Sequence, residues 1–596
     1  MKVKASDYIL KYLENKGIEI CFCVTGGAAA HLFESLSQSN IKYICNYHEQ
    51  ACAMCAEGYT RIKNKPALVL VTNGPGSSNL VTGVAAAFQD SLPMIVISGQ
   101  VPTKQTIESS GAKLRQFGVQ ELDCVSIFKP ITKFSYQIRN HNEVKEVLEK
   151  AIDLANSGRK GPVYIEIPLD IQNSLIDVED VHYKNKEVEK LKSEIPLEKI
   201  FKLIRKSKRP LFVIGNGVHL TKSETMFLDL LNYIPIPTAC TWATKDIFDY
   251  DNELYAGNFG ILGERFGNFA IQNSDLLIIL GSRMSIPNVG YNTEMFSPNS
   301  IKILVDIDTE EAKKNSLKID HFLNIDLKYF LEQLNFYIKE NEIKIESENL
   351  KTWIMKIKSW KTNYPVYQNE YTINIDKVNS FFFIEKLGQN LDSNNIVVTD
   401  MGTSFTCTMQ ALKTNSSYRL FTSFALCPMG FGLPGAIGAY YGSDGKSIIC
   451  IAGDGGIQMN IQELQTIIHN KIPIKIFVLN NNGYLAISSM QDNLFNKNYV
   501  GSNNQSGVSS PSFVKIAEAY GFKTFTINDQ NYVEQTIKNV LDFKGPVLCE
   551  IMMKENQLLV PRLQSQRDKE GNIVSPSLEN MFPFLEENEL KQIMTN

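Results

Sequence analysis

Apolar runs rich in β-branched residues end in glycine or asparagine turns along this 596-residue chain, and this pattern most constrains its fold. The clearest pair is SIICIAGDG at 447–455 and IKIFVLNNNG at 474–483, separated by IQELQTIIHN with apolar residues at helical spacing. The pattern predicts strand, turn, helix, strand and turn. Because βαβ units are right-handed, both turns would lie at the carboxyl ends of neighbouring parallel strands.

The same alternation occurs in three stretches, which predicts an α/β chain of three doubly wound parallel-sheet domains. A chain of this length is too long for a single core. We expect domains at 1–175, 196–345 and 378–555. Two polar segments, 176–195 and 346–377, are expected to be linkers, and 556–596 is expected to be a tail that lies across other domains.

Composition excludes several classes of function. The chain is 43% hydrophobic and 21% charged with a net charge of −4, which is typical of a globular protein and gives no basic field for nucleic acid or an anionic membrane. We find neither a membrane-spanning apolar run nor a signal peptide, and expect a cytoplasmic location. Eleven cysteines, mostly inside apolar runs, favour reduced and buried thiols, with little weight on a metal or redox role for Cys52 and Cys55.

Asp454 and Asn481 fall in the two turns described first. On neighbouring strand ends they would face one small volume, where a carboxylate oxygen, an amide oxygen and backbone N–H groups suit Mg²⁺ shared with a phosphate. The alternative is two ordinary turns, because Gly, Asn and Asp are common turn residues. The spacing alone leaves both interpretations open.

Five collinear blocks extend this reading: NYHEQACAMCAEGYTR at 46–61, TNGPGSSNLVTGVAAAFQDSLPMIVISGQVP at 72–102, GPVYIEIPLDIQ at 161–172, MGFGLPGAIGA at 429–439, and the GDG…NN stretch. Together they resemble the acetohydroxyacid (acetolactate) synthase group of thiamine-diphosphate (ThDP) enzymes. The resemblance implies a carboligase that decarboxylates pyruvate and transfers its two-carbon acetyl unit to a carbonyl acceptor. Two alternatives share this donor chemistry: a carboligase acting on a keto sugar nucleotide in surface-polysaccharide synthesis, and a simple 2-keto acid decarboxylase.

Two other classes fit the sequence less well. A dehydrogenase should show GxGxxG, and GNGVHL at 215–220 lacks the third glycine. A catalytically dead homologue should have lost Glu49 or Asp454, and both are present.

The resemblance assigns the Mg²⁺ and diphosphate ligands. Asp454 and Asn481 would supply side-chain oxygens to Mg²⁺, and Gly483 its carbonyl. Gly456 stands where the family commonly has Ser. The residues expected around the rest of the cofactor in this domain are Gly402, Thr403, Ser404, Gly453, Gly455, Gly456 and Tyr484.

Glu49 has the sharpest implied role, a hydrogen bond to the aminopyrimidine ring of ThDP in a dry site. Met429 would hold the cofactor bent, Gln120 would face the reacting carbonyl, and the loop of Gly26 and Gly27 would meet cofactor or substrate oxygen. The alternatives are a helix-capping Glu49 and a Met429 that fills a gap in the core.

The central domain is where acetohydroxyacid synthases bind FAD, and related decarboxylases keep this domain without flavin. Strand–glycine turns are a general nucleotide cradle, and Arg283 favours FAD because it could face a diphosphate. The residues implied for a FAD site are Gly215, Gly217, Gly263, Gly281, Arg283 and Asp306.

Two departures from the family fall near the acceptor. Val119 replaces a Phe, and Met490 stands where biosynthetic synthases have a Trp that selects 2-ketobutyrate. Both changes would open an acceptor pocket. The family also implies a homodimer or homotetramer, because one cofactor is shared by two chains, and a possible regulatory subunit.

Overall fold

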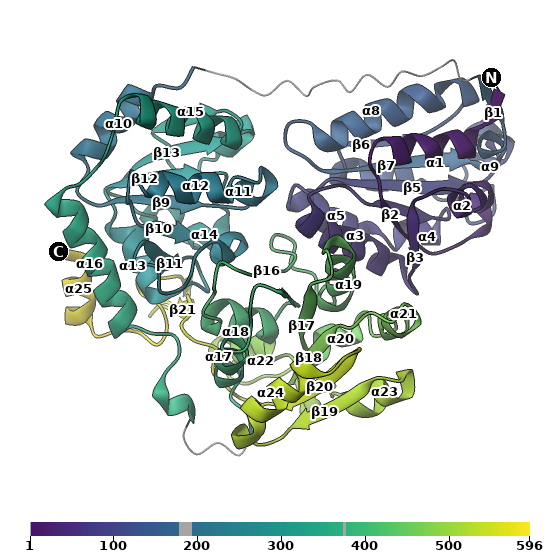
Figure 1. Cartoon of the computed structure of the whole chain (residues 1–596). Coiled ribbons are helices and arrows are strands. Elements are labelled where there is room, and N and C mark those ends of the chain that lie inside the picture. Colours follow the sequence, from purple (N-terminus) through teal and green to yellow (C-terminus); the bar gives the residue numbers. More distant parts are fainter. Residues whose placement is uncertain (1, 178–193, 373–376, 596) are drawn as a thin grey trace.

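A computed structural model describes residues 2–177, 194–372 and 377–595. Three α/β domains lie in a triangle, with the N-terminal and central domains side by side above the C-terminal one (Figure 1). Each is built on a parallel sheet of six strands, which confirms the predicted fold class. The expected linker at 176–195 lies mostly outside the described residues.

The N-terminal sheet has the order β3-β2-β4-β5-β7-β6. Its central strands are buried on both faces, as the unbroken apolar runs predict. A short antiparallel pair, β1 (Lys2–Lys4) with β8 (Leu175–Asp177), joins the two ends of the domain. The strands are β2 (Ile20–Cys23), β3 (Lys42–Cys45), β4 (Leu68–Val71), β5 (Met94–Gln100), β6 (Phe134–Gln137) and β7 (Pro162–Pro168), and the main helices are α1 (Ala5–Asn15), α2 (Ala30–Ser37), α3 (Glu49–Lys63), α5 (Val81–Gln89) and α8 (Val144–Asn156).

The C-terminal sheet, β16-β15-β17-β18-β20-β19, repeats the N-terminal topology. In both sheets the first strand lies beside the third, so the order reverses between them. The strands are β15 (Asn395–Thr399), β16 (Arg419–Phe421), β17 (Ser447–Gly453), β18 (Lys475–Asn480), β19 (Lys523–Ile527) and β20 (Val547–Met552). The main helices are α17 (Ser380–Gly388), α18 (Thr403–Ala411), α19 (Gly432–Gly442), α20 (Asp454–Gln458), α21 (Glu463–His469), α22 (Leu485–Leu494), α23 (Phe513–Tyr520) and α24 (Val533–Asp542).

The central sheet differs, with the order β11-β10-β9-β12-β13-β14. Counted within the domain this is 3-2-1-4-5-6, the order of dinucleotide-binding folds, which bind their ligand where the order reverses. Here the reversal lies between β9 and β12. The strands are β9 (Pro210–Ile214), β10 (Thr238–Cys240), β11 (Tyr255–Asn258), β12 (Leu276–Leu280), β13 (Ile301–Asp306) and β14 (His321–Asn324), and the helices are α10 (Leu197–Lys206), α11 (Gly217–Leu220), α12 (Glu224–Leu231), α13 (Arg265–Asn273), α14 (Ile286–Val289), α15 (Leu327–Glu340) and α16 (Glu348–Asn363).

Helices α3 and α19 join the N- and C-terminal domains, and they lie side by side near the middle of the molecule (Figure 1). A Cβ on Gly438 would overlap the carbonyl oxygen of Cys55, and a Cβ on Gly58 would overlap that of Gly435. Glycine is therefore required for this close approach of two backbones. The contact fixes α3, whose first residue is Glu49, against the C-terminal domain.

Part of the expected linker at 346–377 belongs to the central domain instead. Ser347 caps α16 by accepting a hydrogen bond from the Leu350 N–H, and Trp353 and Trp360 are buried in the central core. The prediction of a linker is wrong here because the apolar stripe is narrow and is surrounded by Lys, Ser, Thr and Asn, which makes the segment look polar.

The tail packs on the central domain, as the sequence suggests. The Arg265 guanidinium donates to the Met581 carbonyl, and the Asn268 amide donates to the Leu578 carbonyl. The tail also forms the small antiparallel pair β21 (Gln566–Arg567) and β22 (Ile573–Val574) and helix α25 (Glu587–Thr595), which lies beside α16 (Figure 1).

All eleven cysteines are free thiols, as expected. Within residues 2–177, 194–372 and 377–595, no helix has the length and apolar character needed to cross a membrane.

Candidate active site

The glycine turn after β17 and the asparagine turn after β18 lie side by side in the C-terminal domain. β17 and β18 are parallel neighbours, with Gly453 opposite Leu479, so both strands end at the same edge of the sheet. Asp454 follows β17 as the first residue of α20, and Asn481 follows β18. The Asp454 carboxylate accepts from the Gly483 N–H at 3.0 Å, which ties the turns together.

The three predicted metal ligands lie together in one buried group, here called the oxygen cluster, in which the Asn481 amide donates its N–H to the Gly483 carbonyl. Asp454 and Asn481 are 2% and 5% exposed, and the Asn481 amide nitrogen is 2.9 Å from the Gly483 carbonyl oxygen. An amide that turns over puts its oxygen in that position. A carboxylate, an amide oxygen and a carbonyl oxygen are the hard oxygen ligands that Mg²⁺ prefers. Among the described residues, no group of three or more His, Cys, Asp or Glu side chains is placed to hold a metal. The cluster at Asp454 is of another kind, because it combines one carboxylate, one amide and one backbone carbonyl.

Burial raises the pKa of Asp454, and its hydrogen bonds from Ser510 and the backbone N–H groups of Gly483 and Gly455 act in the opposite direction. A carboxylate in this position is stabilised by a cation beside it. The Mg²⁺ assignment of these residues stays a prediction.

The end of the neighbouring strand β15 leads into three predicted cofactor-binding residues, Gly402, Thr403 and Ser404. They follow β15, which pairs with β17 on the other side, and Thr403 and Ser404 open α18. The Ser404 hydroxyl donates to the Asp400 carbonyl at 3.1 Å, so its role in the fold is that of a helix-end hydrogen bond. The strand order reverses between β15 and β17, where ligands of such sheets bind.

Asp400 is a site residue that sequence reasoning missed. Its buried carboxylate accepts from the Gly430 N–H at 3.0 Å and from the Met401 N–H at 2.7 Å, and burial raises its pKa to about 6. A Cβ on Gly456 would lie 2.8 Å from this carboxylate, so the turn after β17 packs closely on Asp400. The signal was an Asp directly after a buried strand, in VVTDMG.

Met429, Gly455 and Tyr484 meet at the same edge. A Cβ on Gly455 would overlap the Tyr484 ring and lie 3.3 Å from the Met429 methyl carbon. Met429 is half-buried and packs against the hydrophobic core of the C-terminal domain. The predicted diphosphate, metal and ring-supporting residues of this domain are thus gathered in one place.

Glu49 begins α3 at the carboxyl end of the N-terminal sheet. His48 caps the helix through its side chain, which accepts from the Gln50 N–H at 3.1 Å, so Glu49 is not the helix cap. The Glu49 carboxylate accepts from the Asn79 amide at 2.9 Å and is half-buried, above a buried row of small and apolar residues: Ala51, Cys52, Ala53 and Met54.

The other N-terminal candidates lie at the strand-order reversal between β2 and β4: Gly26 and Gly27 follow β2, and the Gln120 loop packs on the turn after β4. A Cβ on Gly26 would overlap the Thr72 side chain, and one on Gly76 would lie 2.9 Å from Thr72 and 3.5 Å from the Glu49 carboxylate. Gly27 faces open space. Gln120 has a left-handed backbone with φ of 56°, and its carbonyl oxygen packs tightly on Gly74, which places the Gln120 loop on the turn after β4.

The acceptor candidates are far less enclosed. Val119 is 75% exposed, and its carbonyl accepts from the Asn73 amide at 2.9 Å. Met490 is 42% exposed on α22. Within the described ranges, no hydrogen bond joins Glu49 to the metal or diphosphate candidates of its own chain. We refer to the residues around Glu49 as the N-terminal half-site and to those around Asp454 as the C-terminal half-site.

A cavity of about 330 Å³ lies where the central sheet reverses its order. Gly215 follows β9 and Gly281 follows β12, and these two turns form its floor with Gly217, Arg283 and Asp306. Gly263 does not line the cavity; a Cβ there would lie 2.7 Å from the Asn258 carbonyl oxygen, so this glycine serves a tight turn. The indole N–H of Trp242, which also lines the cavity, has no hydrogen-bond partner among the described residues.

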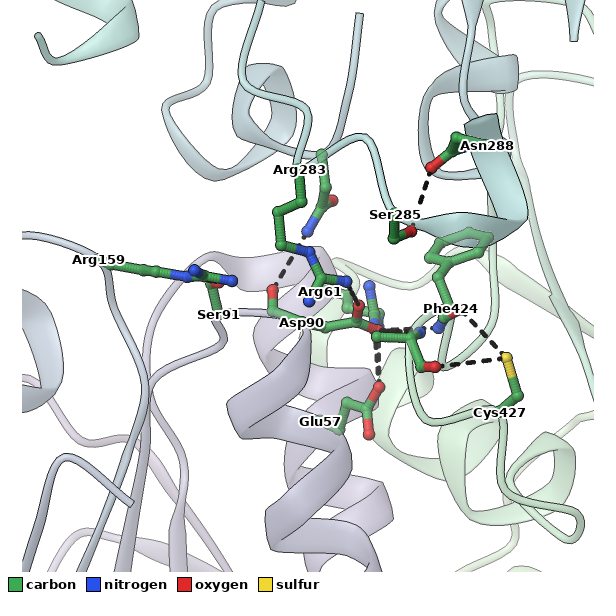
Figure 2. A network of polar contacts seen from close by, with 12 residues as sticks. Glu57, Arg61, Asp90, Ser91, Arg159, Arg283, Ser285, Asn288, Phe424 and Cys427 are labelled. Atoms are coloured by element: carbon green, nitrogen blue, oxygen red, sulfur yellow. Dashed lines mark hydrogen bonds and ion pairs between the residues drawn. The ribbon is translucent and has the colours of Figure 1, made fainter. Parts of the chain in front are cut away.

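All three domains line this cavity, and its charged residues come from the N-terminal and central domains. Arg159 and Lys160 come from the N-terminal domain, and burial lowers the pKa of Lys160. Figure 2 shows Arg283 reaching from the central domain towards Asp90, with 3.9 Å between guanidinium and carboxylate. Asp90 also binds the buried Arg61 and accepts from the Phe424 N–H of the C-terminal domain at 2.8 Å. Sequence reasoning missed Arg159, Lys160 and Asp90, which lie outside the central domain.

Three family models match the chain in order. The N-terminal TPP binding domain of the thiamine pyrophosphate enzymes matches residues 3–127, their central domain 197–334, and their C-terminal TPP binding domain 400–551.

Curated relatives cover nearly the whole chain. A probable acetolactate synthase large subunit of Methanococcus aeolicus is 32% identical, over 94% of this chain and 93% of its own. The large subunit of acetolactate synthase isozyme 1 of Escherichia coli is 31% identical over 93% and 95%, and the chloroplastic acetolactate synthase 2 of Nicotiana tabacum is 31% identical over 94% and 84%. The strand-end sites, the three family models and these relatives agree, and the chain belongs to the thiamine pyrophosphate enzyme family as a protein of the acetolactate synthase type.

Proposed function

We propose that the protein decarboxylates pyruvate and transfers the two-carbon acetyl unit to a carbonyl acceptor, in a site built on thiamine diphosphate and Mg²⁺. The observation that carries the proposal is the oxygen cluster of Asp454, Asn481 and Gly483, beside a strand-order reversal and in relatives named as acetolactate synthases. Thiamine diphosphate supplies a carbanion that adds to the keto carbon and accepts the electron pair released with CO₂.

The C-terminal domain would hold the diphosphate end. Asp454, Asn481 and Gly483 would ligate Mg²⁺, which neutralises the buried carboxylate and the diphosphate together. The N-terminal ends of α18 and α20 would offer backbone N–H groups to the diphosphate. Met429, in contact range of Gly455, would support the cofactor's rings.

Glu49 would hold a proton at the ring nitrogen of the aminopyrimidine. Asn79 fixes the direction of its carboxyl group, and the buried residues behind it keep that side of the site dry. Gln120 and the open space beside Gly27 would receive the substrate's carbonyl group.

We infer further that two copies of the chain complete each site. Glu49 is half-buried, and apolar side chains near it are exposed, with Tyr47 at 58% and Tyr43 at 52%. On the C-terminal domain Met459 is 48% and Ile487 42% exposed. A homodimer that sets the N-terminal half-site of one chain on the C-terminal half-site of another would cover both patches, and a homotetramer would repeat that contact. The relatives' designation as large subunits supports a regulatory partner.

The central cavity fits a dinucleotide such as FAD. Its position at a 3-2-1-4-5-6 reversal suits a diphosphate between the Gly215 and Gly281 turns, and Arg283, Arg159 and Lys160 supply positive charge. The unpartnered Trp242 N–H suits an acceptor atom of the same ligand. FAD in this place would be held by its diphosphate and would leave the proposed reaction without a redox step.

The test is product analysis. Purified protein with ThDP and Mg²⁺ is given pyruvate alone and then pyruvate with 2-ketobutyrate, an aldehyde or a keto sugar nucleotide. Acetolactate or a mixed acyloin with release of CO₂ supports the proposal. Acetaldehyde as the main product with every acceptor would show simple decarboxylation instead.

A further inference from the structure

A single buried carboxylate of the C-terminal domain holds the segment that leads into Glu49. Glu463 is the first residue of α21 and is 0% exposed. One of its oxygens accepts from the backbone N–H groups of Tyr47 at 3.0 Å and His48 at 3.2 Å. The other accepts from the Asn46 amide at 2.8 Å and from the Thr466 hydroxyl at 2.7 Å.

Three of these four bonds cross between domains and end on consecutive residues. Asn46, Tyr47 and His48 form the whole link between β3, which ends at Cys45, and α3, which begins at Glu49. The side chain of Tyr47 is exposed, so its position gives little packing to fix the link. The direction in which Glu49 leaves the sheet therefore depends on the Glu463 carboxylate.

We propose that Glu463 is a positioning residue, which places Glu49 against the aminopyrimidine ring by fixing the 46–48 link. The inference rests on the proposed role of Glu49. In this role Glu463 contacts neither cofactor nor substrate. Asp454 lies nine residues earlier in the sequence, so Glu463 links the segment that carries Asp454 to the N-terminal half-site of the same chain.

Charge and reach can be separated at this position. Glu463→Gln keeps the length of the side chain, so its amide oxygen can still accept from Tyr47 and His48. Its NH₂ group would face Asn46, whose own amide oxygen has no partner among the described residues and can turn to accept. Glu463→Asp keeps the charge and withdraws the carboxylate by one carbon–carbon bond, ~1.5 Å, which breaks the bonds to the link.

The first test needs no cofactor. Backbone hydrogen–deuterium exchange of the peptide containing Tyr47 and His48 is measured in the wild-type protein and both variants. We expect the amides to exchange at least about tenfold faster in Glu463→Asp and at a near wild-type rate in Glu463→Gln. Gln462→Ala is the matched control, because Gln462 bonds Asn460 within its own domain. Equal protection in all variants would overturn the proposal.

The second test follows the proton at C2 of bound ThDP by its exchange with deuterium. Misplacing a catalytic group by ~1 Å costs about 100-fold, so Glu463→Asp should slow this exchange by ~10–100-fold, and lower kcat more than it raises KM, with Glu463→Gln within a few-fold of wild type. The reverse order, Asp better than Gln, would show that the charge matters and the reach does not. If Glu49→Gln itself leaves C2 exchange unchanged, the proposed function fails; if it stops exchange while the Glu463 variants do not differ, only the present inference fails.

Discussion

The C-terminal and central domains both place glycine turns where a parallel sheet reverses its order, yet the two places differ in charge. Beside β17 the turns present protein oxygens, with Asp454 and Asn481 buried around the Gly483 carbonyl. Beside β9 the turns meet Arg283, and Arg159 and Lys160 are added from another domain. The fold provides a ligand-binding edge in each case, and side chains decide how a diphosphate is held. Under the proposed assignments, the first place would hold a diphosphate through a bridging cation, whereas the second would bind it directly through Arg283.

Asp454→Ala should give the largest effect, because it should impair ligand binding at the β17 edge and leave the β9 edge unchanged. Without the carboxylate the metal site loses its charge, and we expect Mg²⁺-dependent ThDP affinity to fall by at least ~10²-fold, on the scale of breaking a buried ion pair. Calorimetry measures this, and FAD or another dinucleotide titrated into the same variant serves as the control. Normal ThDP affinity would contradict the metal assignment.

Glu49→Gln should keep ThDP affinity and lower activity by ~10²–10⁴-fold, since an amide cannot hold the proton that the ring nitrogen requires. Mixing it with Asp454→Ala tests whether the half-sites come from different chains. If they do, exchange of subunits between the two inactive proteins should restore about a quarter of the activity, because ~half of the dimers are mixed and each has one intact site. No recovery, with subunit exchange shown independently, would place a whole site in one chain.

Arg283→Ala sharpens the other side of the comparison. Loss of a charged donor to a diphosphate should weaken dinucleotide binding in the central cavity by ~10–100-fold. Arg283→Lys keeps the positive charge but loses the guanidinium group, which can donate two parallel hydrogen bonds to a phosphate. We therefore expect its affinity for the dinucleotide to be intermediate. Fluorescence of bound flavin and the melting temperature with and without FAD measure the effect, and unchanged ThDP affinity is the control. A wild-type flavin affinity in Arg283→Ala would show that the ligand does not use this arginine.

Met490→Trp should have the smallest effect, because residue 490 lies outside both strand edges and is half exposed. An added aromatic wall is worth ~1 kcal/mol, so we expect the rate with a bulky acceptor to fall about fivefold more than acetolactate formation. Competition between paired acceptors gives the ratio. An unchanged ratio would show that Met490 does not line the acceptor pocket.

The sequence by itself determined the three parallel sheets and the residues at the two oxygen-bearing turns. Both depend on local order along the chain, because each buried strand is followed by a glycine turn and then by a helix. Asp454 and Asn481 follow two such strands, so they could be placed on one edge of the sheet before any contact was known. Glu49 was identified differently, through the resemblance of its segment, residues 46–61, to the ThDP enzymes.

Other features were decided by tertiary structure alone. Glu463 meets Tyr47 across 416 residues, and Arg159 reaches the central cavity from the neighbouring domain. α16 joined the central core because Trp353 and Trp360 found a surface to pack on, although its sequence looks like a linker. Such contacts depend on how finished domains fit together, and no pattern within one segment records which surface it will meet. The ends of strands can be predicted from the local sequence. The residues that pair with a buried charge, or that cover a narrow apolar stripe, are determined only by how the domains pack.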